Sequence, residues 1–377
     1  MLRILFTGGG TGGHIYPLIA VARELKIAAV SENLKVKSFY LGACGDYKET
    51  LGGEGITVMK VAGGKFRNYR SILNFFDIFR VIYAFFQSLV KLYFLMPDVI
   101  FSEGGPGALP VVIAGRFYRI PVIIHDANAI PGKTSLISAR YASRIGISFE
   151  SAAGYFNRTN IALTGNPIRS GLVENMPSKE FAKTSLGWNG AIPVLLVLGG
   201  SQGATRINDF IFENLDFLIR DFQIYHQVGR ANYDETINQV GFLLDNFTAE
   251  EKSRYRPVAY FETDEEMRKA YAASDLIIAR AGAGTIFEIA AAHKPSILIP
   301  LPEGADQKAN AYAFADSGAA IVILQENLTP NILISQVKKI LGDKAQAETM
   351  IKAAAQFSKP EAGRMLAEEI LRLAGRT

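Results

Sequence analysis

Cysteine, tryptophan and histidine are scarce in this chain, which has one Cys, one Trp and four His among 377 residues. The single cysteine, Cys44, excludes an internal disulfide, and no cysteine cluster is present that could form a thiolate zinc site. A strong charge of one sign is also missing, because the net charge of +4 is too small to indicate a nucleic-acid partner. The apolar run before the first glycines is too short for a secretory signal. These absences favour a folded enzyme of a reducing, cytoplasmic compartment.

A long uncharged apolar run is missing as well. The most apolar stretch, residues 72–96, is interrupted by Asp77, Arg80 and Lys91 and therefore does not predict a membrane span. Polar or small residues recur in it every three or four positions, which puts a narrow polar stripe on an otherwise apolar helix. The stripe consists of Asn74, Asp77, Arg80, Ala84, Ser88 and Lys91.

Two interpretations of this helix are possible, and its aromatic side chains beside basic ones support the first. They favour a peripheral contact with an anionic membrane surface. The candidate contact residues are Phe75, Phe79, Arg80, Phe86 and Lys91. A helix buried in the core of a domain accounts for the same apolar residues, so the sequence leaves both readings open.

Short runs rich in Val, Ile and Leu alternate with helix-length segments, a pattern typical of parallel sheets covered on both faces. Thirteen strands are expected, at 3–6, 35–41, 56–61, 98–102, 121–125, 144–148, 161–164, 193–199, 222–228, 257–261, 275–280, 295–300 and 319–324. Asn166-Pro167 marks a linker between two series. The prediction is an α/β fold of two Rossmann-like, doubly wound domains facing a cleft, over 1–165 and 166–377. The last helix, expected in 361–375, is a candidate to cross back to the first domain.

Both halves open with a strand, a glycine loop and a helix, FTGGGTGGH at 6–14 and VLGGSQGATRIND at 197–209. Such a loop at a helix start presents backbone N–H groups that favour a phosphate or carboxylate. Gly8, Gly10 and Gly13 formally fit G-x-G-x-x-G. A nicotinamide site, however, also needs an acid at the end of the second strand, and Asp46 comes several residues too late. The loops therefore predict anion sites and disfavour a nicotinamide oxidoreductase.

Five motifs, in order, carry a resemblance that covers most of the chain: GGTGGHxxPxxAxAxEL, NAIPG, GNPIR, LGGSQGA and ARAGAGTxxEIAAAxxPSILIPLP. Together they resemble the MurG family of bacterial glycosyltransferases. The resemblance implies a GT-B fold and transfer of N-acetylglucosamine from UDP-GlcNAc to the 4-hydroxyl of MurNAc-pentapeptide on undecaprenyl diphosphate. It also implies inversion at the anomeric carbon, no cofactor or metal ion in the chemical step, and a peripheral location at the cytoplasmic face of the cell membrane.

Residues of both halves match positions that the family uses for the donor. Gly282 and Gly284 open a helix whose first N–H groups suit a diphosphate, and Glu288, one turn on, suits the ribose hydroxyls. Arg169 matches the family's arginine near the diphosphate. The implied donor set is Thr11, Gly12, Gly13, Asn128, Arg169, Ser201, Gly282, Ala283, Gly284, Thr285, Glu288 and Gln307. Plain helix capping by Thr285, dipole compensation by Glu288 and a surface salt bridge of Arg169 are the structural alternatives.

Two residues are candidates for the catalytic base. His14 ends the first glycine loop at a helix start, where imidazole is a credible base near neutral pH. Asp126, in HDANAIPG, stands where the family usually has glutamate, so it is a second candidate with a shorter side chain. The preceding His125 directly follows an apolar strand and is expected to be partly buried.

The largest departure from the family is the segment FSEGGPGALP, where the family usually shows GGYxSGP. Its glycines could still form an anion-binding nest for the acceptor diphosphate. Gly10, Gly104, Gly105 and Gly107 are the candidate residues. Glu103 has the wrong charge for that role if it faces inward. A transferase acting on another lipid such as diacylglycerol, a UDP-sugar epimerase and a non-catalytic membrane scaffold therefore remain as alternatives.

Overall fold

The computed structural model describes residues 1–61, 73–157, 160–200 and 203–375. The chain divides into two compact units, which we call unit 1 (residues 1–169 and 359–377) and unit 2 (residues 170–358). The division expected after residue 165 therefore lies a few residues before the one observed. The C-terminal residues return to unit 1.

Unit 1 is built on a seven-stranded parallel sheet with the strand order β3-β2-β1-β4-β5-β6-β7. The strands are β1 (Leu2–Thr7), β2 (Val36–Gly42), β3 (Thr57–Lys60), β4 (Val99–Ser102), β5 (Val122–Asp126), β6 (Arg144–Ile147) and β7 (Ile161–Leu163). The order reverses between β1 and β4, and open α/β sheets bind ligands at the carboxyl ends of strands at such a point.

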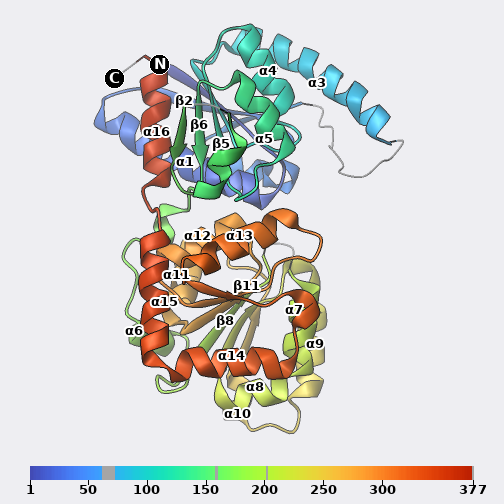
Figure 1. Cartoon of the computed structure of the whole chain (residues 1–377), viewed down its shortest axis with the longest axis vertical. Coiled ribbons are helices and arrows are strands. Elements are labelled where there is room, and N and C mark those ends of the chain that lie inside the picture. Colours follow the sequence, from blue (N-terminus) through green and yellow to red (C-terminus); the bar gives the residue numbers. More distant parts are fainter. Residues whose placement is uncertain (62–72, 158–159, 201–202, 376–377) are drawn as a thin grey trace. The chain divides into compact units, whose positions relative to one another are not determined.

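Helices cover both faces of this sheet because its central strands are buried and apolar along nearly their whole length. They are α1 (Gly12–Ser31), α2 (Lys48–Gly53), α3 (Leu73–Leu95), α4 (Leu109–Phe117), α5 (Lys133–Ser138) and α16 (Ala362–Leu373). The last helix, α16, packs along α1, and its residues Leu366, Ile370 and Leu371 join the same buried cluster as Ile4 and Phe6 of β1 (Figure 1).

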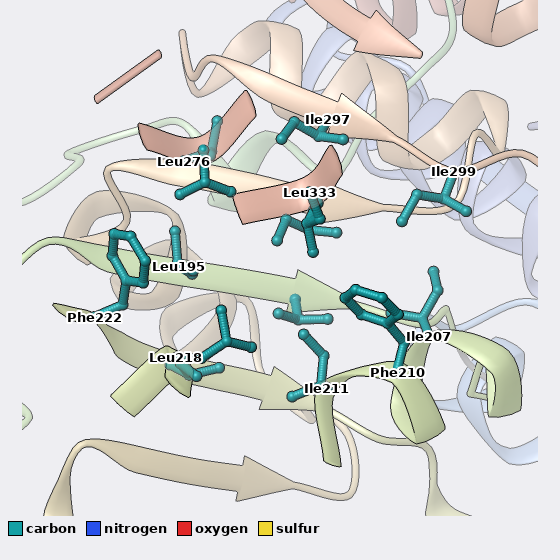
Figure 2. Close-up of a cluster of buried hydrophobic side chains, with 14 of the residues drawn as sticks. Leu195, Ile207, Phe210, Ile211, Leu218, Phe222, Leu276, Ile297, Ile299 and Leu333 are labelled. Atoms are coloured by element: carbon teal, nitrogen blue, oxygen red, sulfur yellow. The ribbon is translucent and has the colours of Figure 1, made fainter. Parts of the chain in front are cut away.

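Unit 2 contains a six-stranded parallel sheet with the order β10-β9-β8-β11-β12-β13. Its strands are β8 (Val194–Leu198), β9 (Gln223–Gln227), β10 (Tyr255–Val258), β11 (Leu276–Ala279), β12 (Ser296–Leu298) and β13 (Ala320–Val322). The switch point lies between β8 and β11. Figure 2 shows side chains from the strands, such as Leu195 and Leu276, packed with Phe210 and Leu218 from helices on one face.

The helices of unit 2 alternate with its strands. They are α6 (Lys179–Ser185), α7 (Thr205–Glu213), α8 (Leu215–Asp221), α9 (Tyr233–Leu243), α10 (Ala249–Ser253), α11 (Asp264–Ala273), α12 (Ala283–Ala291), α13 (Ala305–Asp316), α14 (Pro330–Gly342) and α15 (Lys344–Phe357). Short 3₁₀ segments complete the chain at Gly45–Tyr47, Ala139–Tyr141, Glu150–Tyr155, Ser170–Leu172, Arg230–Asn232 and Gln325–Asn327.

The thirteen expected strands are all present, and the predicted α/β architecture is confirmed. One strand is displaced: the prediction of 257–261 was wrong in its bounds, because β10 runs from Tyr255 to Val258. Its partner β9 ends opposite Val258, at Gln227, so residues 259–261 have no neighbouring strand to extend the ladder.

Helix α3 turns its small residues inward and its aromatic residues outward. Ala84 and Ser88 of the predicted polar stripe are fully buried on the side that packs against α4, and the Lys91 ammonium donates to the Lys60 carbonyl. The alternative that residues 72–96 form a helix buried in a domain core was therefore wrong for the other face of α3, which is exposed. Residues that are 47–78% exposed there form, with Phe117 of α4, what we call the aromatic patch: Phe79, Ile82, Tyr83, Phe86, Val90, Tyr93, Phe94 and Phe117.

Arg80, beside the aromatic patch, is also exposed. Phe75 lies in the first turn of α3, but its side chain is outside the described part of the structure. Across the described residues, none of the helices has the length and apolar character needed to cross a bilayer.

Candidate active site

The first glycine loop lies at the switch point of the unit 1 sheet, between β1 and the start of α1. Its backbone is held from β2, since the Tyr40 hydroxyl donates to the Gly8 carbonyl at 3.0 Å. Close approach explains the glycine at position 10, where a Cβ would lie 3.0 Å from the carbonyl oxygen of Ala43. The loop therefore reaches the helix start in one fixed path, with little room for side chains of its own.

His14 lies in the first turn of α1. Its Nδ1 is 2.9 Å from the hydroxyl oxygen of Thr11, the N-cap residue, and this hydroxyl makes no capping bond to the helix backbone. Burial lowers the pKa of His14 from its ordinary value of 6.5, and the charge of Asp126 opposes part of that shift. Neutral imidazole is therefore the dominant form of His14 near pH 7.

The second glycine loop, between β4 and α4, packs directly against the first. Gly105 has a φ of +82°, and a Cβ there would lie 2.7 Å from the Gly9 nitrogen and 3.3 Å from His14 Nε2. Only glycine fits this combination of left-handed backbone and close approach. Gly104 also has a positive φ, and Gly107 lies beside the Gly8 carbonyl. The structure thus brings this candidate acceptor loop together with His14.

Asp126 ends β5 and is buried. One oxygen of its carboxylate accepts the Asn128 N–H at 3.0 Å, and the other accepts the Gly132 N–H at 3.2 Å. Burial raises its pKa, while a hydrogen bond from Ser135 and those from the backbone counter the shift. Asp126 therefore holds the loop that carries the half-buried Asn128, because each of its carboxylate oxygens accepts a hydrogen bond from that loop.

Glu103 and His125 form a buried pair beneath the second glycine loop. The Glu103 Oε2 lies 2.9 Å from His125 Nδ1, and the two residues are 4% and 0% exposed. His125 Nε2 lies 3.0 Å from the Gly165 carbonyl oxygen and 3.1 Å from Ser148 Oγ. The expectation that His125 is buried was correct. Glu103, whose charge does not suit an anion site, points into the protein interior.

Arg169 is the last residue of the first segment of unit 1. Its guanidinium stacks over the ring of Tyr16, with 5.1 Å between the guanidinium carbon and the ring centroid. Tyr16 belongs to α1, one residue before Pro17, and its ring also meets Tyr47 edge-on. The arginine is buried, and an aromatic contact holds it near the start of α1.

The switch point of the unit 2 sheet carries the start of α12. Gly282 is the N-cap and supplies no side-chain capping bond, so Thr285 is not the cap but lies in the first turn. A Cβ at Gly284 would have no atom within 4 Å, and the nearest atom to one at Gly282 would be the Thr285 hydroxyl at 4.0 Å. A Cβ at either glycine therefore has room, while Ala283 between them is buried.

Glu288 and Gln307 have defined neighbours. The buried Tyr271 hydroxyl donates to Glu288 Oε2 at 2.9 Å, which fixes the half-buried carboxylate. The Gln307 Oε1 accepts the Leu301 N–H at 3.2 Å, which leaves its amide nitrogen as a donor for a hydroxyl. Asn310, three residues on, donates to the Ala281 carbonyl and so ties α13 to the loop before α12. Ser201 lies outside the described residues.

Sequence reasoning missed two residues that hold candidate site residues, Tyr16 against Arg169 in unit 1 and Tyr271 against Glu288 in unit 2. No motif spacing signalled either contact. The Q-x-x-N spacing from Gln307 did mark Asn310, which lies behind Ala281. Within the described ranges, no group of three His, Cys, Asp or Glu side chains is placed to hold a metal ion.

Comparison with known sequence families matches both units. The glycosyltransferase family 28 N-terminal domain matches residues 4–147, and the glycosyltransferase family 28 C-terminal domain matches residues 194–365. Each unit has a parallel α/β sheet with a glycine loop at its switch point. Together with the two domain matches, this architecture defines a two-domain glycosyltransferase of family 28.

Curated relatives extend the match over nearly the whole chain. The UDP-N-acetylglucosamine--N-acetylmuramyl-(pentapeptide) pyrophosphoryl-undecaprenol N-acetylglucosamine transferase of Treponema denticola is 35% identical, covering 96% of this chain and 94% of its own. Transferase 2 of the same name from Bacillus thuringiensis is also 35% identical, covering 93% and 95%. The crystal structure of Acinetobacter baumannii MurG aligns with a TM-score of 0.73 and 26% identity over 99% and 100% of the two chains. The chain belongs to the MurG family.

A UDP-GlcNAc 2-epimerase from Neisseria meningitidis has a TM-score of 0.66 at 13% identity, over 99% of this chain and 100% of its own. At that identity the likeness shows the shared fold alone.

Proposed function

We propose that this chain transfers N-acetylglucosamine from UDP-GlcNAc to the 4-hydroxyl of MurNAc-pentapeptide on undecaprenyl diphosphate, forming lipid II from lipid I. The observation that carries the proposal is identity of about 35% over more than nine-tenths of the chain to transferases named for that reaction. The motif residues that the family uses are present at the two switch points described above. Peptidoglycan synthesis is the process that this activity serves.

His14 is the proposed base. We assign His14 the tautomer in which Nδ1–H donates to the Thr11 hydroxyl, 2.9 Å away, so that the Nε2 lone pair takes the proton from the acceptor 4-hydroxyl. That oxygen attacks the anomeric carbon, the bond from this carbon to the UDP oxygen breaks, and UDP leaves with the electron pair. The attack comes from the face opposite UDP, so the configuration inverts. A lowered pKa supports the role, because it keeps the imidazole neutral at pH 7.

Asp126 supports the chemistry in this proposal by shaping the Asn128 loop and by its charge on His14, rather than by taking the proton. Its buried carboxylate already accepts two backbone N–H groups. The acceptor diphosphate is assigned to Gly10 and to the turn of Gly104, Gly105 and Gly107, in which the positive φ of Gly104 and Gly105 suits a nest of N–H groups.

The donor is assigned mainly to unit 2. The N–H groups of Gly282, Ala283, Gly284 and Thr285 at the start of α12 stabilise the departing diphosphate without a metal ion.

The remaining donor contacts follow the same assignment. Glu288 accepts the ribose hydroxyls, Gln307 donates to the sugar, and Ser201 contacts a phosphate. The residues assigned to the donor from unit 1 are Thr11, Gly12, Gly13, Asn128 and Arg169.

The aromatic patch is the proposed contact with the membrane that carries the acceptor. Exposed aromatic side chains of a single helix, with the exposed Arg80 beside them, suit the interface of an anionic bilayer. Phe75 remains assigned to this contact by its position in the first turn of α3. Lys91, whose ammonium binds the Lys60 carbonyl, contributes charge at the edge of the patch. We place the protein peripherally at the cytoplasmic face of the membrane.

The alternative lipid acceptor, diacylglycerol, rested on Glu103 in the acceptor loop. Because that carboxylate is buried against His125, it does not put negative charge in the acceptor site. One experiment tests the assignment: purified chain with UDP-GlcNAc is given lipid I, diacylglycerol or no acceptor, in EDTA. We expect a GlcNAc-containing lipid product with lipid I alone. A product only with diacylglycerol, or release of free sugar and UDP at an equal rate without acceptor, would refute it.

A further inference from the structure

The buried pair of Glu103 and His125 joins the carboxyl ends of four adjacent strands. Glu103 follows β4, His125 is the penultimate residue of β5, Ser148 follows β6 and Gly165 follows β7. Because the Gly165 carbonyl can only accept, His125 Nε2 carries a proton. The contact between Nδ1 and Oε2 then holds one further proton between the ring and the carboxylate.

Such a pair is expensive to bury, and it is incompletely satisfied. Burial raises the pKa of Glu103, against the opposing charge of His125. Burial lowers the pKa of His125, but Glu103, the Gly165 carbonyl and the charge of Asp126 together outweigh this, so the pKa of His125 is raised overall. The second carboxylate oxygen of Glu103, Oε1, is buried without a hydrogen-bond partner among the described residues. Replacing a buried ionic pair by apolar side chains is often neutral or stabilising, so stability alone does not account for it.

Glu103 of the pair directly precedes the Gly104–Gly105 turn, which lies against the proposed base His14. Glu103 is followed by Gly104 and Gly105, and the Gly105 backbone lies against the Gly9 nitrogen and His14 Nε2. A Cβ at Gly104 would lie 2.7 Å from the Ser135 hydroxyl, so the turn is closely packed there as well. The path of this turn, and with it the space around His14 Nε2, therefore depends on where the Glu103 side chain is fastened.

We propose that Glu103, through its hydrogen bond to His125, is a positioning residue for His14. It fastens the Gly104–Gly105 turn to the strand ends and thereby fixes the place of His14 Nε2. The hydrogen bond is the operative feature, and the negative charge is not. The kinetic part of this inference rests on the proposed function.

Three substitutions separate bond, charge and volume. Glu103→Gln keeps the hydrogen bond, because its amide donates to Nδ1 of a neutral His125 while Nε2–H still binds the Gly165 carbonyl. Glu103→Met keeps the volume without the bond. Glu103→Asp keeps the charge on a side chain one methylene too short to reach Nδ1. We expect Glu103→Gln to retain kcat within about threefold, and the Met and Asp variants to lose at least about tenfold.

The KM for UDP-GlcNAc should stay within about twofold in all three variants, because the pair belongs to unit 1 and the donor is assigned mainly to unit 2. Should Glu103→Met fail to fold, as judged by its thermal transition, Glu103→Asp carries the same expectation. Wild-type kcat in a folded Met or Asp variant, or equal losses in Gln and Met, would overturn the proposal.

Imidazole NMR supplies a readout that needs no activity. The chain has four histidines, His14, His125, His226 and His293, and the last two belong to unit 2. In ¹⁵N-histidine-labelled protein, Glu103→Met should shift the ring signals of both His125 and His14 and leave those of His226 and His293 in place. A shift of His125 alone would show that the pair does not position His14. Because this result is independent of turnover, an inactive wild-type enzyme would refute the proposed function without deciding the inference.

Discussion

Glu288 combines a charge with a fixed orientation, and this makes it the sharpest test of donor binding at the scale of one residue. The buried Tyr271 hydroxyl holds one oxygen of the carboxylate at 2.9 Å. Replacing Glu288 by alanine removes hydrogen bonds of a charged group to the ribose, worth about 1.5–3 kcal/mol. The KM for UDP-GlcNAc, measured from initial rates, should rise about ten- to a hundredfold with a smaller change in kcat.

Tyr271→Phe provides the matched control for this variant. It leaves the Glu288 carboxylate in place and removes only the hydroxyl that orients it. The donor KM should therefore rise by only about threefold, in line with one hydrogen bond of about 0.5–1 kcal/mol. If Glu288→Ala has a wild-type KM, the carboxylate serves α12 and not the ribose.

The protonation of His14 should set the acid side of the pH profile. Burial lowers its pKa below 6.5, and the base form is the one that accepts the proton. We therefore expect kcat to be nearly constant from pH 7 to pH 8 and to fall as the pH drops through a midpoint below 6.5. His14→Ala should reduce kcat far more than it raises the donor KM; an equal loss in both would make His14 a residue that shapes the loop.

Asp126→Asn tests the direction of that shift. The negative charge of Asp126 raises the pKa of His14, so removing the charge should lower it further. The acid midpoint in kcat should consequently move to lower pH, even though the change also disturbs the loop and reduces the plateau rate. Loss of the acid limb altogether would instead identify Asp126 as the titrating base.

Motif spacing singled out His14, Glu288 and Gln307 as candidates, because each lies near the start of a helix that a glycine precedes. Their roles stay predictions. The direction of Glu103 was not predictable in the same way. A residue following a buried strand can point to either side of the loop, and its partner His125 is 22 positions away in sequence. The stacking of Arg169 on Tyr16, 153 residues apart, likewise exists only in the tertiary fold.

At the scale of the element, α3 shows what periodicity can and cannot give. The interval of three to four residues predicted a helix in residues 72–96 with one distinct face, and α3 runs from Leu73 to Leu95. Whether that face points inward or outward depends on its partner, α4, and the pattern alone did not contain this information. Small buried residues, Ala84 and Ser88, let α4 approach closely, so the aromatic residues of α3 remain outside.

The aromatic patch should bind anionic vesicles, and two of its exposed rings on α3 are the best targets. Phe86 and Phe94 are 59% and 78% exposed, whereas Phe85 packs partly against the core cluster. The double variant Phe86→Ser with Phe94→Ser should therefore fold normally. Each lost ring contributes about 1.5–3 kcal/mol of apolar transfer, so binding in a vesicle sedimentation assay should weaken at least about a hundredfold.

Unit 2 offers a control with the same chemistry. Phe217 and Phe242 are 59% and 84% exposed, and they lie on α8 and α9. Replacing both by serine should leave vesicle binding unchanged. If the control pair weakens binding as much as the α3 pair, the contact with the bilayer is unspecific, and α3 has no special part in it.

At the scale of the whole molecule, the chain is two units with their own apolar cores, and unit 1 is completed by the last residues of the chain. The core of unit 2 is drawn from residues 195–350, and unit 1 has two clusters on either side of its sheet. Since α16 supplies buried residues beside β1, unit 1 becomes complete only when the C-terminus has returned. The strand pattern predicted the two sheets, because both are parallel and their central strands are buried and largely apolar.

Because the chain has two apolar cores, we expect two transitions on heating. The proposed donor site places most of the UDP contacts in unit 2, so UDP should act mainly on the transition of that unit. At a hundred times its dissociation constant, UDP should stabilise unit 2 by about 2.7 kcal/mol. For a unit of this size, that raises its transition by about 5–10 °C in scanning calorimetry, in EDTA, with a much smaller change in the other transition. Glu288→Ala at the same UDP concentration should lose roughly half or more of the shift. A shift that appears only when Mg²⁺ is added would mean that the amide groups at the start of α12 are not sufficient to hold the diphosphate.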